Sequence, residues 1–244
     1  MESLNYVAHL KRQLDAEQDA SKGQRTRALL LYNAAVVMER HGIASDLVAR
    51  VCKLSKVSRG TFYTYFDDSM AAVMAVGTDF LRQAEGWAAG IRRGGDLFGS
   101  LMLLLGFEAR LHAENPGILR CLYVVDPLST TNKQPYLLWQ KVRHEWRVIL
   151  SAELAARLGT PPRDRATLHV LYGLAGMADD VLFQMYVSEN PFFTRTIVDG
   201  EDMVELMAVM WFRTLTGKNP PARRLNARTR EATKLLARAE KRLA

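Results

Sequence analysis

The chain has 244 residues, of which 48% are hydrophobic and 24% are charged, and a chain of this kind can bury a substantial core in one or two domains. No apolar run approaches the length of a membrane span, and the charged segment 1–20 does not match a secretory signal, so we expect no membrane partner. Cys52 and Cys121 are the only cysteines, which indicates neither a disulfide framework nor a zinc motif. We therefore expect a cytoplasmic protein without a metal or other cofactor.

The formal net charge of +7 is unevenly distributed along the chain. Segment 22–66 contains eight lysines and arginines against two acidic residues, and segment 218–244 contains nine against two, so the remainder is net acidic. Basic segments of this kind are typical of proteins that contact a polyanion. The distribution favours two separate roles, one for the basic ends and another for the acidic middle.

The N-terminal part predicts helices separated by short breaks. An apolar stripe from Leu4 to Leu14 indicates an extra helix or arm within residues 1–20. A strong helical pattern follows over 24–40, and Gly42 lies where a residue in the left-handed conformation commonly ends a helix.

Two short helices come next. Asp46 is suited to the N-cap of a helix over 47–54, and Ser58 is suited to the cap of a helix that ends near Tyr65. Three helices within about 45 residues, the last two joined by a tight turn, are typical of a helix-turn-helix, in which the second short helix enters the major groove of DNA. We therefore predict a DNA-binding domain over residues 21–69.

The second short helix has one side suited to a core and another suited to DNA. A helical wheel places Phe62 on the side opposite Gly60 and Thr64. Glycine is less favourable than alanine inside a helix by about 1 kcal/mol, which indicates that the backbone at Gly60 closely approaches another backbone or a DNA edge. Arg59 can bind guanine or a phosphate through two hydrogen bonds, and Tyr63 can donate to a phosphate. The alternative is a small helical bundle whose rings only pack and whose basic face is solvated.

The segments RALLLYNAAVVMERHG and DLVARVCKLSKVSRGTFYTYFDDSMAAV resemble the DNA-binding domain of TetR-type transcriptional regulators. The shared features are an arginine that opens the first helix (Arg27), the glycine that ends it (Gly42), Val-Ser in the turn (57–58) and a Gly-Thr-aromatic-Tyr run that ends in phenylalanine (60–66). The family usually has glycine in the turn, where this chain has Lys56.

The chain departs from the family pattern at two further positions. The family usually has threonine or serine at Asp46 and commonly has lysine at Ser69. The residues and the resemblance together predict DNA contacts within the motif Leu47 to Phe66 and close to it, from Arg27, Asp46, Lys56, Ser58, Arg59, Gly60, Thr61, Tyr63, Thr64 and Tyr65.

Beyond residue 69 the sequence again predicts only helices, so the expected fold class is all-α. The resemblance implies that residues 70–217 form a larger helical domain that binds a ligand and dimerises, but it gives no ligand. The helices that we expect in this domain lie near 70–92, 96–114, 116–124, 134–158, 163–188 and 201–216.

Two of these helices are candidates for a homodimer interface. Segment 203–215 is apolar nearly all round, which is typical of a helix buried on more than one side, and Gly173 and Gly176 would let another helix approach closely. We expect both helices to pair with their copies in a two-fold four-helix interface, as the resemblance also implies. The alternative is that they form the core of a monomer. The interface candidates are Gly173, Gly176, Asp180, Met207 and Trp211.

Polar residues on an apolar stripe suggest a ligand site. Glu108 and His112 lie one turn apart on the apolar face that contains Leu105, where they would anchor an apolar effector in a cavity. The alternative is a local contact between the two side chains at the edge of a core. The full set of ligand candidates is Leu105, Glu108, His112, Tyr123, Trp139, Trp146 and Met177.

The basic tail, residues 218–244, has a rough helical stripe of apolar residues. It predicts a helix that packs on the body, an accessory DNA contact or a frayed, solvated terminus.

The leading hypothesis is a ligand-responsive transcriptional regulator, a repressor that leaves a near-palindromic operator in double-stranded DNA when a small apolar effector binds. A ligand-independent DNA-binding or architectural protein is the alternative. An enzyme that uses Glu108 and His112 is less favoured, because the chain has no glycine-rich phosphate loop, no metal-ligand spacing and no nucleophile elbow. We therefore expect no catalytic or metal site.

Overall fold

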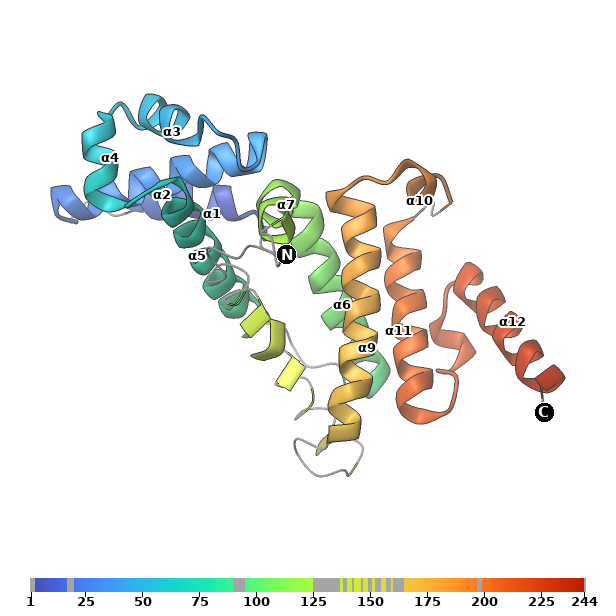
Figure 1. The fold of residues 1–244 in the computed structure, drawn as a ribbon. Coiled ribbons are helices and arrows are strands. Elements are labelled where there is room, and N and C mark those ends of the chain that lie inside the picture. The colour runs from blue at the N-terminus through green and yellow to red at the C-terminus, as the bar shows by residue number, and fades with distance from the viewer. Residues whose placement is uncertain are drawn as a thin grey trace. The chain divides into compact units, whose positions relative to one another are not determined.

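The computed structural model describes residues 3–16, 20–89, 95–124, 165–196 and 199–243, together with residues 137, 140, 141, 143–145, 147, 148, 151, 155, 156 and 159. All regular structure in these residues is helical, which confirms the predicted all-α class (Figure 1). None of the described helices is long and apolar enough to cross a membrane.

The chain divides into two compact units that are each built from two stretches of sequence. The first unit comprises Met1–Ala89 and Leu111–Glu145, and the second comprises Gly90–Arg110 and Trp146–Ala244. The helices of the first unit are α1 (Tyr6–Ala16), α2 (Lys22–His41), α3 (Leu47–Ser55), α4 (Arg59–Tyr65), α5 (Ser69–Ala89), the last turn of α6 (Leu97–Glu114) and α7 (Pro116–Val124).

Local capping explains where α2 begins and ends. The Ser21 hydroxyl accepts a hydrogen bond from the Gln24 backbone, and the Gln24 side chain accepts one from the Ser21 backbone, at 3.3 and 2.9 Å. This capping box starts α2 at Lys22, slightly before the predicted start. Gly42 follows the end of the helix and donates its N–H to the Met38 carbonyl. Its φ of 69° is positive, as expected, but its ψ of −160° differs from that of the left-handed helical cap that the sequence predicted.

The N-terminal helix is docked against the first unit. Tyr6 is buried, and its hydroxyl donates to a carboxylate oxygen of Asp79 on α5 at 2.8 Å. The buried Asn115 side chain accepts from the Tyr6 backbone at 2.7 Å and donates to the Leu4 carbonyl at 2.9 Å. Helix α1 therefore belongs to the core of this unit.

Helices α2 and α7 approach each other closely at Gly117. A Cβ atom at Gly117 would lie 2.0 Å from the backbone oxygen of Glu39, so only glycine fits. The Glu39 carboxylate accepts hydrogen bonds from the backbones of Gly117 and Ile118 at the start of α7, at 3.2 and 2.9 Å. This carboxylate thus caps α7.

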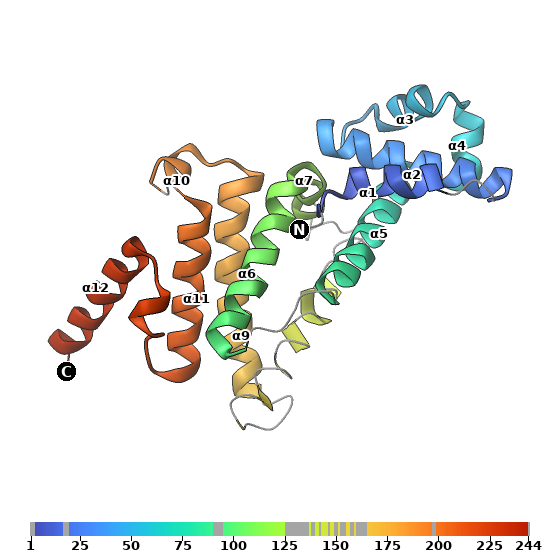
Figure 2. The same ribbon diagram turned by 180° about the vertical axis from the view of Figure 1, so that it is seen from behind.

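The second unit is a helical layer with one apolar core. Figures 1 and 2 show α6, α9 and α11 side by side, and Leu101, Leu171 and Met207 are among the side chains that they bury together. Helix α10 was not predicted, and the predicted helix at 134–158 lies largely outside the described residues. The elements of this unit besides α6 are α9 (Arg165–Leu182), the π-turn Phe183–Val187, α10 (Pro191–Thr196), α11 (Gly200–Thr216), the 3₁₀ turn Ala222–Arg224 and α12 (Ala227–Leu243).

The start of the basic tail is anchored to the second unit. Asn226 caps α12 by accepting from the Thr229 backbone at 2.8 Å, and its own backbone donates to Glu205 on α11 at 2.7 Å. Arg228 on α12 forms an ion pair with Asp202 on α11. The sequence left open whether the tail packs on the body, contacts DNA or is frayed. The first turn of α12 packs on the body, through these contacts with α11.

Candidate nucleic-acid interface

The turn between α3 and α4 has a well-defined backbone. Lys56 ends α3 in the left-handed conformation, with φ 54° and ψ 42°, and the next residue, Val57, donates its N–H to the Cys52 carbonyl at 3.1 Å. Ser58 then caps α4, as predicted, because its hydroxyl accepts from the Thr61 backbone at 3.0 Å. The turn thus fixes the direction in which α4 leaves α3.

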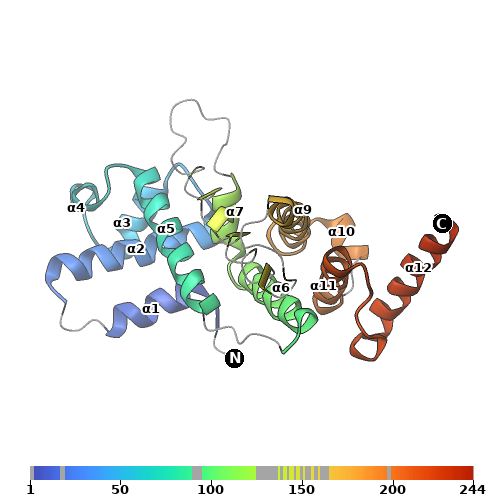
Figure 3. The same cartoon turned by 90° about the horizontal axis from the view of Figure 1, so that it is seen from below.

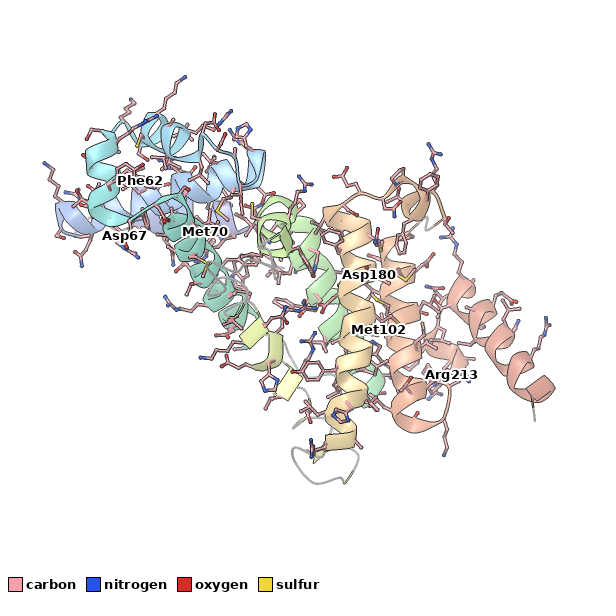
Figure 4. All side chains as sticks on the ribbon, in the orientation of Figure 1. Phe62, Asp67, Met70, Met102, Asp180 and Arg213 are labelled. Carbon is pink, nitrogen blue, oxygen red and sulfur yellow. The ribbon has the colours of Figure 1, made fainter. Side chains whose placement is uncertain are left out.

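Helix α4 is held by an aromatic anchor. Phe62 is completely buried, and its ring centroid lies 5.5 Å from that of Tyr63 and 5.4 Å from that of Phe66 (Figure 4). Helix α3 is held by a buried hydrogen bond of 2.8 Å, which Asn33 on α2 donates to Ser55. This contact was not predicted, although the single asparagine in the apolar run LLLYNAAVVM was a signal for it.

The other face of α4 is exposed and polar. Ser58, Arg59, Gly60, Tyr63 and Thr64 are all exposed, in agreement with the helical wheel. A Cβ atom at Gly60 would meet only the Ser58 hydroxyl oxygen, at an ordinary distance of 3.6 Å. No contact within the described chain therefore requires glycine at this position.

Two further candidates for DNA contact, Tyr65 on α4 and Arg27 on α2, lie where these two helices meet. Tyr65 is half-buried, and its hydroxyl lies 3.7 Å from the place of a Cβ atom on Gly23. Arg27 is exposed, with its guanidinium carbon 6.0 Å from the centroid of the Phe66 ring. The structure therefore brings the first turns of α2 next to the end of α4.

The segment that contains α4 is rich in exposed cations. All eight lysines and arginines of segment 22–66 are exposed, whereas its two acidic side chains are engaged within the chain. Glu39 caps α7, and Asp46 accepts a hydrogen bond of 2.8 Å from Arg50. This hydrogen bond lowers the pKa of the Asp46 carboxyl from its ordinary value. The segment therefore presents exposed cations to solvent, of which Arg50 is paired with Asp46, and the exposed Asp67 and Asp68 follow it directly.

The prediction for Asp46 needs a correction. Asp46 occupies the N-cap position of α3, but its side chain makes no capping hydrogen bond. Arg50 lies one turn later on the same side of the helix, and the charged hydrogen bond to it replaces the cap.

The candidate ligand residues fall into both units. In the first unit, the His112 Nε2 atom lies 3.2 Å from the Tyr123 hydroxyl oxygen, so two of the candidates contact each other. Leu105 is buried in the core of the second unit, where Met177 packs against the same core. Glu108 is half-buried on α6, while Trp139 and Trp146 lie outside the described residues.

The candidate dimer residues differ in exposure. Gly173, Gly176 and Asp180 are exposed on α9, and a Cβ atom at either glycine would meet nothing within 4 Å (Figure 4 labels Asp180). Met207 and Trp211 have relative exposures of 1% and 2% and fill the core of their own chain. Their side chains therefore present no surface to a second copy, which agrees with the monomer-core alternative for these two residues.

Within the described part of the chain, no group of three or more His, Cys, Asp or Glu side chains could hold a metal ion. No protein-family model matches the chain, and no curated protein matches it.

Proposed function

We propose that the protein is a transcriptional regulator that binds double-stranded DNA through the exposed face of α4. One observation carries this proposal: a short helix is anchored by the buried Phe62, and its opposite face is exposed and polar, with Arg59 on it and Lys56 in the turn before it. A structural bundle would not need this separation of a buried aromatic anchor from an exposed face of polar and basic residues.

The side chains of this face suit the two kinds of contact that DNA recognition requires. Arg59 is exposed and can bind a guanine edge or a phosphate, whereas the hydroxyls of Tyr63 and Ser58 are suited to phosphate oxygens. The exposed lysines and arginines on α2 and α3 would bind further phosphates and release counterions from the DNA.

We further propose that the protein acts as a homodimer that reads a near-palindromic operator. The support is the exposed stripe of α9, where Gly173 and Gly176 leave room for a second helix to approach closely. In such a dimer the two copies of α4 would lie about 34 Å apart, or a multiple of this distance, in successive major grooves. Release of the operator by an effector, and repression rather than activation, rest on the resemblance to TetR-type regulators.

A pair of arginine substitutions tests the DNA-binding surface. Fluorescence anisotropy would measure the affinity for a labelled duplex over a range of salt concentrations. Arg59→Gln should weaken binding by about 1–3 kcal/mol. Arg12→Gln is the matched control, because Arg12 is an exposed arginine on α1 outside the basic segment 22–66, and it should change the affinity less than about twofold. Equal effects of the two substitutions would contradict the proposal.

A further inference from the structure

A groove in the first unit lies between α1, α2 and a residue of α5, and no function has been assigned to it. Figure 3 shows α1 beside α2 in this unit. The volume of the groove is about 580 Å³, which falls in the usual range for small-molecule sites. Three leucines (10, 14 and 31) provide an apolar lining, while Gln13, Arg27 and Asp79 provide polar groups.

The two charged side chains among the described lining residues, Asp79 and Arg27, differ in their partners. The Asp79 carboxylate accepts the Tyr6 hydroxyl at 2.8 Å and lies 3.8 Å from the Arg82 guanidinium. Burial is the main cause that raises the pKa of the Tyr6 hydroxyl, and the negative charge of Asp79 raises it further. The phenol therefore stays protonated and continues to donate its hydrogen bond to the Asp79 carboxylate. Arg27 forms no ion pair with any described residue. Among the described lining residues, Arg27 is therefore the charged group that has no ion-pair partner.

Polar groups beside Arg27 also suit an anion. The Gln24 side-chain oxygen is already bonded to the Ser21 backbone at 2.9 Å, which leaves its NH₂ group as the available donor. Gln13 supplies a second amide on the opposite helix. An arginine, amide donors and an apolar wall form the combination that binds a carboxylate with a hydrocarbon body.

We propose that this groove binds a small monocarboxylate with an apolar body, whose carboxylate pairs with Arg27 and whose body packs on Leu10, Leu14 and Leu31. A second consequence rests on the proposed DNA binding. Because Arg27 also lies beside Phe66 at the end of α4, a bound carboxylate would withdraw this cation from the DNA backbone. Loss of one phosphate contact would reduce the slope of log K against log salt by about 0.9.

Binding to the groove is tested on the full-length protein without DNA. Sodium octanoate is titrated into ¹⁵N-labelled protein, with octan-1-ol as an uncharged probe of the same chain length. The backbone amide signals of Leu10, Gln13 and Ala28 should shift saturably with octanoate and at least about tenfold more weakly with octanol. Shifts that do not saturate, or equal binding of the two probes, would overturn the proposal.

Three variants connect this binding to the groove. Arg27→Gln should weaken octanoate binding at least about tenfold, whereas Arg25→Gln, at an exposed arginine that does not line the groove, should change it less than about twofold. Ala20→Phe should also weaken binding, because Ala20 lines the groove just before the cap of α2 and a larger side chain would fill it. Octanoate binding that is insensitive to both Arg27→Gln and Ala20→Phe would refute the site.

The regulatory consequence has its own readout. Octanoate should lower the affinity of the wild-type protein for labelled duplex DNA and should have no effect on Arg27→Gln. If octanoate binds in the groove but leaves the DNA affinity of the wild type unchanged, the link to DNA is wrong while the site stands. A protein that binds octanoate but no DNA would overturn the proposed function and leave the groove assignment intact.

Discussion

Substitution of Gly60 by alanine separates a structural requirement for glycine from a requirement imposed by DNA. Gly60 lies in the first turn of α4, is exposed and has an ordinary φ, and a new Cβ atom would meet only the Ser58 hydroxyl oxygen, at 3.6 Å. Alanine restricts the unfolded chain more than glycine does and is favoured in helices. Gly60→Ala should therefore raise the free energy of unfolding by about 0.4–1 kcal/mol.

The same substitution should weaken DNA binding. If the backbone of α4 approaches a DNA edge at Gly60, the added methyl group would force the helix away, and the affinity should fall at least about tenfold, or about 1.4 kcal/mol. A variant that is more stable yet binds less tightly would identify a glycine that DNA recognition requires. Urea denaturation would measure the stability, and fluorescence anisotropy with a labelled duplex would measure the affinity.

Gly86→Ala is a matched control for this experiment. Gly86 is exposed within α5, and a Cβ atom there would meet nothing within 4 Å. It should raise the stability by a similar amount and leave DNA affinity unchanged. If Gly60→Ala also stabilises the protein without loss of affinity, the inferred close approach of α4 to DNA is wrong. If it destabilises the protein, the description of α4 is wrong.

Three further predictions concern the packing of the first unit. Phe62→Ala should lower the free energy of unfolding by about 3–5 kcal/mol in urea denaturation, because it empties the anchor of α4. Gly117→Ala should lower it by about 3 kcal/mol or more, because the new Cβ atom would overlap the Glu39 backbone, and a loss below about 1 kcal/mol would contradict this packing. Burial raises the pKa of the Cys121 thiol from 9.0 to about 12, so the folded state favours the neutral thiol. The free energy of unfolding should therefore decrease as the pH rises from about 9 towards 12, because the unfolded chain then loses the thiol proton more readily. In the Cys52→Ser variant at pH 8, a thiol reagent should therefore modify Cys121 only after urea unfolds the protein.

The helices and turns of the N-terminal part were predictable because local chemistry determines them. Ser58 caps α4 through the Thr61 backbone, and Gly42 ends α2 with a positive φ, as the residue types indicated. The exposed and buried sides of α4 followed from helical periodicity, since Phe62 is buried and Gly60 is exposed. These features depend on neighbours within a few residues.

Contacts between distant residues were not predictable in the same way. The cap that Glu39 provides for α7 joins residues separated by 79 positions, and no pattern in either segment indicates it. The Asp46 side chain could bond either to the backbone at the start of α3 or to Arg50. The sequence does not indicate that it bonds to Arg50 instead of capping the helix. Segment 203–215 is apolar nearly all round, so its sequence does not indicate which side of the helix faces the core of its own chain. The structure shows that Met207 and Trp211 are on that side, because both are buried.

Selection of bound sequences from a random pool of duplex DNA tests the central claim most directly. The wild-type protein should enrich a motif of two inverted half-sites, centred about 10–10.5 base pairs apart or a multiple of this spacing. The Arg59→Gln variant, selected in parallel, should lose base preference at one position of each half-site. A wild-type protein that enriches no motif from the pool would contradict the account.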